Sequence, residues 1–301
     1  MRIEPTGKIL GATVRDVDPR ALTDGEFTEI LRALGEHGVL CFPGRALEAA
    51  DLRAFSARFG EIQMLKGIPH HEPGMPEVTI LSNVRRDGKL IGAPDAGQSW
   101  HTDMTYSKTI GFVNVLSAFM VPMRDGRALG GTEFTNTQAA AADLPAAILA
   151  RLEGLTATHD IEFYWEYMRR EKNSQRPPLT DEQRRQRPPV HHPVLLTHPI
   201  SGRKVIYVNP GFTTCIDGLP TDESADLLRF LLDHVLQDKY RHVHEWTVGD
   251  LLLWDHIGTW HYARPDYGAD EYRLMKRCQV MASKIFDPAF QHAVGIAAPA
   301  A

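Results

Sequence analysis

The sequence lacks several features that would mark a specialised class of protein. Its 301 residues hold only three cysteines, Cys41, Cys215 and Cys278, an odd number without close spacing, which argues against a disulfide framework. No apolar run reaches the roughly 18 residues of a membrane-spanning helix. The first residues, MRIEPTGKIL, have no apolar core of a secretory signal. The net charge of −5 leaves no basic excess. We therefore expect a cytoplasmic protein that binds neither nucleic acid nor membrane.

Three stretches have the apolar spacing of amphipathic helices. Thr23 and Glu26 form a T-x-x-E capping box at the start of the first. A second helix is predicted near residues 52–59, with Gly60 as its C-cap. A third is predicted late in the chain, with Thr221 as its cap. The predicted buried stripes are Phe27, Ile30, Leu31 and Leu34 in the first helix, and Leu227, Leu228, Leu231, Leu232 and Val235 in the third.

Short runs rich in β-branched residues dominate the chain after residue 78. Turn residues separate them, as is typical of a sandwich or jelly roll that carries helices on its outside. The runs cover residues 78–84, 113–122, 193–199, 204–210 and 250–256. We predict one domain over residues 1–301 that is mainly β with flanking helices, an α+β protein.

Residues 160–190 differ from their surroundings in composition. The segment begins with aromatic residues and continues with arginine, glutamine and proline, which offer little to bury. We interpret it as a long inserted loop that acts as a lid over a site. The alternative is a mobile surface linker without a functional role.

The stretch SWHTDMTY, residues 99–106, places His101 and Asp103 two positions apart. In a strand or just beyond its end, such residues point the same way. His261 follows a hydrophobic strand and the tight turn DHIG. Two histidines and one carboxylate form the facial triad of non-haem Fe(II) oxygenases. An isolated H-x-D is more often a surface or structural pair, so the prediction rests on the joint pattern.

Two arginines follow the last histidine of that pattern. The run YRLMKRCQVMAS alternates like a strand, so Arg273, Met275 and Arg277 share one face. Guanidinium groups suit carboxylates and sulfonates because they bind them in a bidentate manner. Two of them in one cavity imply two anionic partners.

These elements together resemble the Fe(II)/2-oxoglutarate-dependent dioxygenases of the taurine dioxygenase and chlorophenoxyacetate dioxygenase (TauD/TfdA) family. The resemblance covers nearly the whole chain, and its elements occur in the family's order. They are HGVLCFPG, AFSARFGEI, WHTDMTY, GGTEF, THPISGRKVIYVNPGF, VGDLLLWDHIGTWHYARPDY and YRLMKR.

The resemblance implies a double-stranded β-helix, or jelly roll, with Fe(II) held by His101, Asp103 and His261. It implies that Arg273 and Thr132 bind the distal carboxylate of 2-oxoglutarate, and that Arg277 binds an anionic group of the primary substrate. A homo-oligomer, either a dimer or a tetramer, is also implied. Trp100 and Tyr106 are expected to form an aromatic wall, with Tyr106 touching the substrate; the alternative is that they are ordinary core aromatics.

The implied reaction consumes O2 and 2-oxoglutarate, releases succinate and CO2, and hydroxylates a C–H bond of a small carboxylate- or sulfonate-bearing substrate. A hydroxylated carbon that also bears a heteroatom would then collapse with bond cleavage. Because related halogenases lack the carboxylate ligand, Asp103 favours hydroxylation, cleavage or desaturation over halogenation.

The sequence departs from the taurine enzymes at three aligned positions. It has Leu65, Ile68 and Gly97 where they have pocket residues, so taurine itself is not the expected substrate. Further polar groups that could either reach a substrate or be solvated are Lys66, His70, His71 and Lys89. Histidines that could suggest a second metal, or could be ordinary hydrogen-bonded side chains, are His191, His192, His242, His244 and His256.

Three alternatives stay open at this point. One is an isonitrile-forming or desaturating 2-oxoglutarate oxygenase that acts on an amino-acid derivative. Another is a jelly-roll metalloenzyme that does not use 2-oxoglutarate, and a third is a binding module with a relict site. The sequence does not identify the primary substrate or the carbon that is oxidised.

Overall fold

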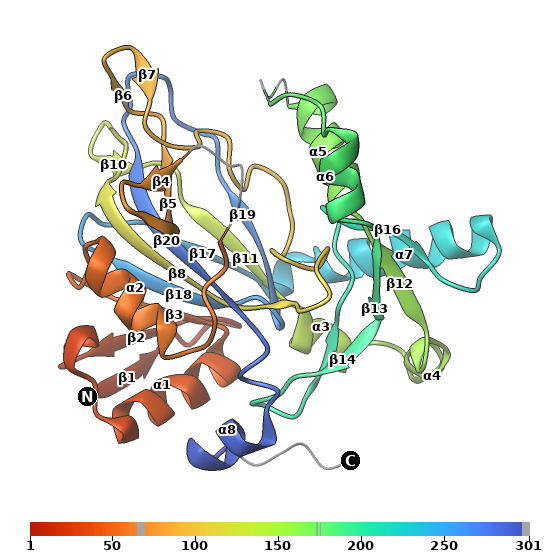
Figure 1. Ribbon diagram of the computed structural model, residues 1–301. Coiled ribbons are helices and arrows are strands. Elements are labelled where there is room, and N and C mark those ends of the chain that lie inside the picture. Colours follow the sequence, from red (N-terminus) through yellow and green to blue (C-terminus); the bar gives the residue numbers. More distant parts are fainter. Residues whose placement is uncertain (65–69, 173, 175, 297–301) are drawn as a thin grey trace.

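The computed structural model describes residues 1–64, 70–172, 174 and 176–296 (Figure 1). Within these residues the largest sheet has eight strands, and only its second and third strands pair in parallel. In spatial order they are β1 (Arg2–Pro5), β2 (Ala12–Arg15), β3 (Val39–Phe42), β18 (Leu251–Asp255), β8 (Gly111–Met120), β20 (Leu274–Met281), β5 (Met75–Ser82) and β4 (His71–Glu72).

Smaller sheets complete the β structure of the described residues. One three-stranded sheet consists of β17 (Arg241–His244), β11 (Thr132–Asn136) and β19 (Thr259–Ala263). Another consists of β13 (Val190–Pro193), β12 (Thr156–His159) and β16 (Thr213–Ile216). The two-stranded pairs are β14 (Leu195–Thr197) with β15 (Lys204–Ile206), β6 (Arg85–Arg86) with β7 (Lys89–Leu90), and β9 (Met123–Arg124) with β10 (Arg127–Ala128).

The helices flank these sheets, so the strand-rich mixed architecture expected from the sequence is confirmed. Figure 1 shows α1 and α2 beside the β1–β3 part of the large sheet, whereas α5 and α6 stand together near β16. No helix of the described residues is both long and apolar enough to cross a membrane. The helices are α1 (Asp24–His37), α2 (Ala49–Ala57), α3 (Thr137–Ala142), α4 (Ala146–Leu152), α5 (Ile161–Glu171), α6 (Asp181–Gln186), α7 (Thr221–Val235) and α8 (Pro288–Ala293), with 3-10 turns at Pro19–Ala21 and Asp238–Tyr240.

The predicted helix ends are right at α1 and wrong at two other helices. The Thr23 side chain accepts the backbone N–H of Glu26, and Glu26 accepts that of Thr23, so the capping box is confirmed. Thr221 is the first residue of α7, and the N-cap position belongs to Pro220, which makes no side-chain cap hydrogen bond. Helix α2 ends at Ala57 with Arg58 as its C-cap, before the predicted Gly60. The predicted stripe of α7 is buried except at Leu232, which is half-buried.

The prediction that residues 160–190 form a loop is wrong, because the segment contains α5 and α6. Asp160 caps α5, and Thr180 forms a capping box with Gln183 at α6. The segment also buries more than its composition suggested, since Ile161, Met168 and Leu179 are all buried. The T-x-x-Q pattern at 180–183 was the signal in the sequence that indicated a helix.

Two of the hydrophobic clusters of the core pack against the large sheet. Helices α1 and α2 cover one side, where Phe27, Phe55 and Phe59 pack edge to face. On another side, Trp254 of β18 packs against Phe134 of β11, with their ring centroids 5.6 Å apart. Residues of β19 and β20 that point between these two sheets therefore lie in a shielded interior.

The capping difference between α1 and α7 predicts unequal costs of truncation. Thr23→Ala removes a side-chain acceptor for an otherwise unpaired N–H, so it should lower the free energy of unfolding by about 1 kcal/mol. Thr221→Ala should change it much less, because Thr221 is not the N-cap. Urea denaturation of both variants measures the difference. Equal losses would contradict the assignment of the caps.

Candidate metal centre and active site

The site is built on a single β-bridge between distant parts of the chain. The N–H of His101 donates to the carbonyl of His261 at 3.1 Å, and the N–H of His261 donates back at 2.7 Å. Directly opposed residues of an antiparallel pair send their side chains to the same face. The two imidazole centroids are accordingly 4.2 Å apart.

Asp103 joins this pair from two residues beyond His101. Its Oδ1 lies 3.5 Å from Nε2 of His101, and its Oδ2 lies 3.6 Å from Nε2 of His261. All three side chains are buried, and their ligand atoms lie within 4.8 Å of one another. The next residue, Met104, has a φ of +68°, a left-handed conformation that is costly for any residue with a side chain. The predicted triad therefore converges on one point.

The surroundings hold these side chains in the forms that bind metals. Nδ1 of His101 lies 2.8 Å from the carbonyl oxygen of Ser99. Because that oxygen can only accept, Nδ1 carries the proton and Nε2 is free to ligate. Burial, helped by the nearby His101, lowers the pKa of His261 well below its ordinary value. Burial alone would raise the pKa of Asp103, but contact with His101 and the charge of Arg277 outweigh it and lower that pKa.

Two groups among the described residues have enough donors close together for a metal. One is His101, Asp103 and His261, and the other is Cys41, His244 and Asp250. In the latter group, Asp250 already accepts from Nε2 of His244 at 3.2 Å and from the N–H of Thr247 at 2.9 Å. Burial also raises the pKa of the Cys41 thiol to about 12. The residues of the His101–Asp103–His261 group are all buried, and they supply the N2O donor set of a non-haem Fe(II) site. We regard this group as the metal candidate.

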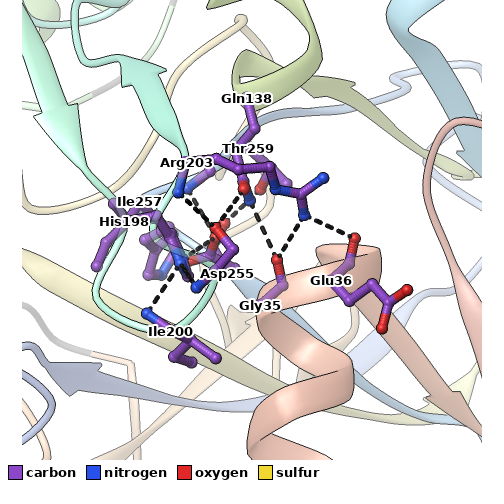
Figure 2. Close-up of polar contacts among 12 residues, drawn as sticks. Gly35, Glu36, Gln138, His198, Ile200, Arg203, Asp255, Ile257 and Thr259 are labelled. Carbon is purple, nitrogen blue, oxygen red and sulfur yellow. Dashed lines mark hydrogen bonds and ion pairs between the residues drawn. The ribbon is translucent and has the colours of Figure 1, made fainter. Parts of the chain in front are cut away.

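A buried histidine–aspartate pair fixes the turn that leads into β19 (Figure 2). The carboxylate of Asp255 accepts the N–H groups of Ile257 and Gly258 at 2.9 and 2.7 Å. Nδ1 of His198 accepts two backbone N–H groups of its own turn, so Nε2 carries the proton that is donated to Asp255 at 3.0 Å. Both side chains are fully buried. The position of His261 therefore depends on a network that the sequence analysis did not identify.

Arg273 is a buried cation whose backbone is firmly held. Its N–H donates to Asn83 at 2.8 Å, and its carbonyl accepts from Ser82 at 2.7 Å. The side chain is 6% exposed and passes Gly130, where an added Cβ would come 3.4 Å from Cδ of Arg273. Burial lowers the pKa of its guanidinium. No carboxylate of the described residues lies within ion-pair distance of it.

Arg277 of β20 approaches the metal candidate. Its Nη1 is 3.5 Å from Oδ2 of Asp103, and its side chain is 12% exposed. Thr132 is also buried, but its hydroxyl accepts from Nε1 of Trp246 at 3.0 Å. The contacts within the described residues do not join Thr132 to Arg273.

Aromatic side chains from three segments line the approach to His101. The Tyr164 ring of α5 stacks on His101 at 5.8 Å and lies 4.8 Å from Phe212. Tyr106 is also 4.8 Å from Phe212. Burial raises the pKa of Tyr164 to about 12 and raises that of Tyr106 as well. The sequence analysis missed Tyr164 and Phe212, although the aromatic run at 163–165 was a visible signal.

Other predicted residues have different surroundings. The Trp100 ring stacks on Tyr262 with a centroid distance of 5.7 Å. This contact does not support the prediction that Trp100 belongs to the aromatic wall. Gly97 has a φ of +79°, and an added Cβ would lie 3.7 Å from Cε1 of His101. His70 is half-buried, and Lys89 is exposed in β7. Leu65, Lys66 and Ile68 lie outside the described residues.

The histidines considered for a second metal do not gather at one place. His191 pairs with Asp217 at 2.9 Å, and His192 contacts the carbonyl of Ser107. His244 belongs to the Cys41 group, and His256 lies beside Asp103.

Comparison with known proteins gives a consistent match. The model of the taurine catabolism dioxygenase TauD, TfdA family matches residues 2–279. The chain is 32% identical to the alpha-ketoglutarate-dependent 2,4-dichlorophenoxyacetate dioxygenase of Cupriavidus pinatubonensis, covering 92% of this chain and 96% of that protein. It is 31% identical to pentalenolactone F synthase of Streptomyces arenae, covering 96% and 97%. The crystal structure of AAD-2 with Mn(II) and N-oxalylglycine superposes with a TM-score of 0.77 at 26% identity, covering 94% and 98%.

The metal assignment predicts a specific loss of affinity. Asp103→Asn keeps the shape of the ligand but removes its charge, so metal affinity should fall by more than the roughly 10–100-fold that outer partners cost. His244→Ala should leave affinity and stoichiometry unchanged, because it alters the other donor group. Titration of the metal-free proteins with Co(II) tests both variants. If only His244→Ala bound Co(II) more weakly, the metal site would have to be assigned to Cys41, His244 and Asp250.

Proposed function

This chain belongs to the TauD, TfdA family, and on that premise we propose that it hydroxylates a small organic molecule that bears one carboxylate or sulfonate group. As a member of this family it is a 2-oxoglutarate-dependent non-haem iron dioxygenase, an oxidoreductase that uses Fe(II), 2-oxoglutarate and O2. We assign the iron to His101, Asp103 and His261. When bound, the iron supplies the activation of O2 that is coupled to decarboxylation of 2-oxoglutarate.

The observation that carries the cosubstrate assignment is the unpaired charge of Arg273. A buried guanidinium without an anionic partner is expensive, so the fold retains it where an external anion completes it. Arg273 stands one residue before β20, the strand that carries Arg277 beside Asp103. We therefore assign the distal carboxylate of 2-oxoglutarate to Arg273. Thr132 stays a proposed helper, since its hydroxyl can still donate a hydrogen bond.

Arg277 and the aromatic wall support the assignment of the substrate. Arg277 is positioned to bind an anionic group close to the metal ligands, and Tyr106, Tyr164 and Phe212 offer ring faces to an apolar body. The dichlorophenoxyacetate-degrading relative acts on a molecule of this kind. A hydroxylated carbon next to a heteroatom would lead to cleavage of that bond. These residues orient the substrate and exclude water.

The same proposal covers the fold type, the 160–190 segment, the cellular location and the oligomeric state. The packing of β18 against β11 supports a double-stranded β-helix, with residues 1–301 as one domain. The contact of Tyr164 with His101 supports a lid role for the 160–190 segment. The three free cysteines support a cytoplasmic location. Exposed Phe163, Phe230 and Tyr272 offer apolar surface for a homo-oligomer, a dimer or a tetramer.

The alternatives from the sequence differ in how well they fit. A jelly-roll enzyme without 2-oxoglutarate is not favoured by the family, and it would leave Arg273 unpaired. A relict binding module is equally disfavoured because the donor set is complete. Desaturation or isonitrile formation shares the same cosubstrate, and product analysis distinguishes it from hydroxylation.

Replacement of Arg273 should separate cosubstrate binding from metal binding. Arg273→Ala should weaken 2-oxoglutarate binding at least about tenfold, because a buried charge-assisted pair is lost, while Co(II) affinity is largely retained. Arg264→Ala is the matched control, since Arg264 already has ion-pair partners in Glu133 of β11 and Glu245. Equilibrium dialysis with labelled 2-oxoglutarate measures the effect. Normal 2-oxoglutarate turnover in Arg273→Ala would refute the assignment.

A substrate panel tests the proposed function itself. Purified enzyme with Fe(II), ascorbate, 2-oxoglutarate and air should form succinate slowly, and an aryloxyacetate, alkyl sulfonate, sulfate ester or N-alkyl amino acid should accelerate this. With the accelerating class, Arg277→Gln should raise the KM at least about tenfold and leave basal succinate formation in place. No succinate from iron-loaded protein would refute the function. An unchanged KM in Arg277→Gln would refute only the role of Arg277.

A further inference from the structure

A fourth imidazole, that of His256, lies at the metal candidate without an assigned role. Its side chain is fully buried, and neither ring nitrogen has a hydrogen-bond partner among the described residues. Its Nε2 is 3.9 Å from Oδ2 of Asp103, and its ring centroid is 5.9 Å from that of His261. A buried polar ring with no partner is uncommon and requires a physical reason.

The chain holds this ring where it is. The N–H of His256 donates to Phe112 at 2.8 Å, and its carbonyl accepts from Thr102 at 2.6 Å. Gly111 leaves the space that the ring occupies, since an added Cβ there would come 3.1 Å from Cδ2 of His256. The ring is therefore fixed in direction by both neighbouring segments.

The facing atoms indicate which hydrogen bond the ring can make. An imidazole nitrogen that bears a proton is a donor, and Nε2 is the ring nitrogen that faces Asp103. Oδ2 of Asp103 is the facing acceptor, and it too lacks a hydrogen-bond partner among the described residues. The gap of 3.9 Å exceeds a normal N–H···O distance by about 1 Å, so the hydrogen bond requires the imidazole and the carboxylate to approach each other by that amount.

We propose that His256 is a positioning residue that donates from Nε2 to Oδ2 of Asp103 and so holds this carboxylate in a monodentate orientation, with Oδ1 directed to the metal. The proposal rests on the assignment of Asp103 as a ligand. It follows the general behaviour of metal sites, in which hydrogen bonds to a ligating carboxylate fix its orientation. Arg277 reaches the same oxygen from another side, at 3.5 Å. When the substrate binds Arg277, that guanidinium is shared with the substrate, whereas His256 still donates to Asp103.

Metal affinity tests this role without relying on turnover. His256→Leu removes the donor at similar volume, whereas His256→Gln keeps an N–H near the position of Nε2. Co(II) titration of the metal-free proteins should show affinity about 10–100-fold weaker in the leucine variant and close to wild type in the glutamine variant. His159→Leu is the matched control, because His159 is also fully buried with an unpartnered Nε2, but its ring packs on His192 and Tyr207. Its Co(II) affinity should stay unchanged.

The outcomes separate this role from simple packing. Wild-type affinity in His256→Leu, or equal losses in the leucine and glutamine variants, would overturn the proposal. Thermal unfolding of the metal-free proteins verifies folding, and His256→Met repeats the test if the leucine variant does not fold. Failure of the proposed metal site is recognised separately, because Asp103→Asn would then bind Co(II) as tightly as the wild type.

Discussion

The reciprocal hydrogen bonds between His101 and His261 are the constraint on which the site depends. They bring together residues that are 160 positions apart in the sequence, and they require both side chains to leave the bridge on one face. Once that bridge forms, the position of Asp103 is restricted. Asp103 is two residues after His101, and the chain turns at Met104. Backbone pairing therefore sets the directions of the ligand side chains, and these directions give the ligand geometry.

The bridge is in turn supported by polar groups that contact no ligand. Asp255 accepts the N–H groups at the start of the turn before β19, and His198 donates to Asp255 from the residue that follows β14. Burying a carboxylate is costly unless its oxygens are fully hydrogen-bonded, and the three donors to Asp255 meet that requirement. The same rule makes the incomplete partners of Asp103 and His256 informative. The complete set of donors at Asp255 fits a supporting role, whereas Asp103 and His256 face each other at the metal candidate.

The sequence predicted those parts of the site that depend on local periodicity. An i, i+2 spacing grouped His101 with Asp103, and an i, i+4 spacing grouped Arg273 with Arg277, because a strand repeats every two residues. Such spacings could not pair Asp255 with His198 or place His256 beside Asp103, since both contacts depend on how sheets pack. The α5–α6 segment was misread because its arginine, glutamine and proline content decided the interpretation, although Ile161 and Met168 share one buried stripe of α5. The error at Thr221 has another origin: a threonine before an apolar stripe fits either the cap or the first turn.

The net charge of the site limits the charge that a bound substrate can carry. Arg273 and Arg277 contribute two positive charges and Asp103 one negative charge, while burial keeps the imidazole of His261 neutral. A divalent metal leaves three positive charges in a shielded interior, and 2-oxoglutarate as a dianion compensates two of them. The remaining positive charge lies nearest Arg277, and an uncompensated charge in such a place is costly. A monoanionic substrate restores neutrality, whereas a neutral molecule or a dianion does not. Electrostatic balance thus favours a single carboxylate, sulfonate or sulfate ester group on the primary substrate.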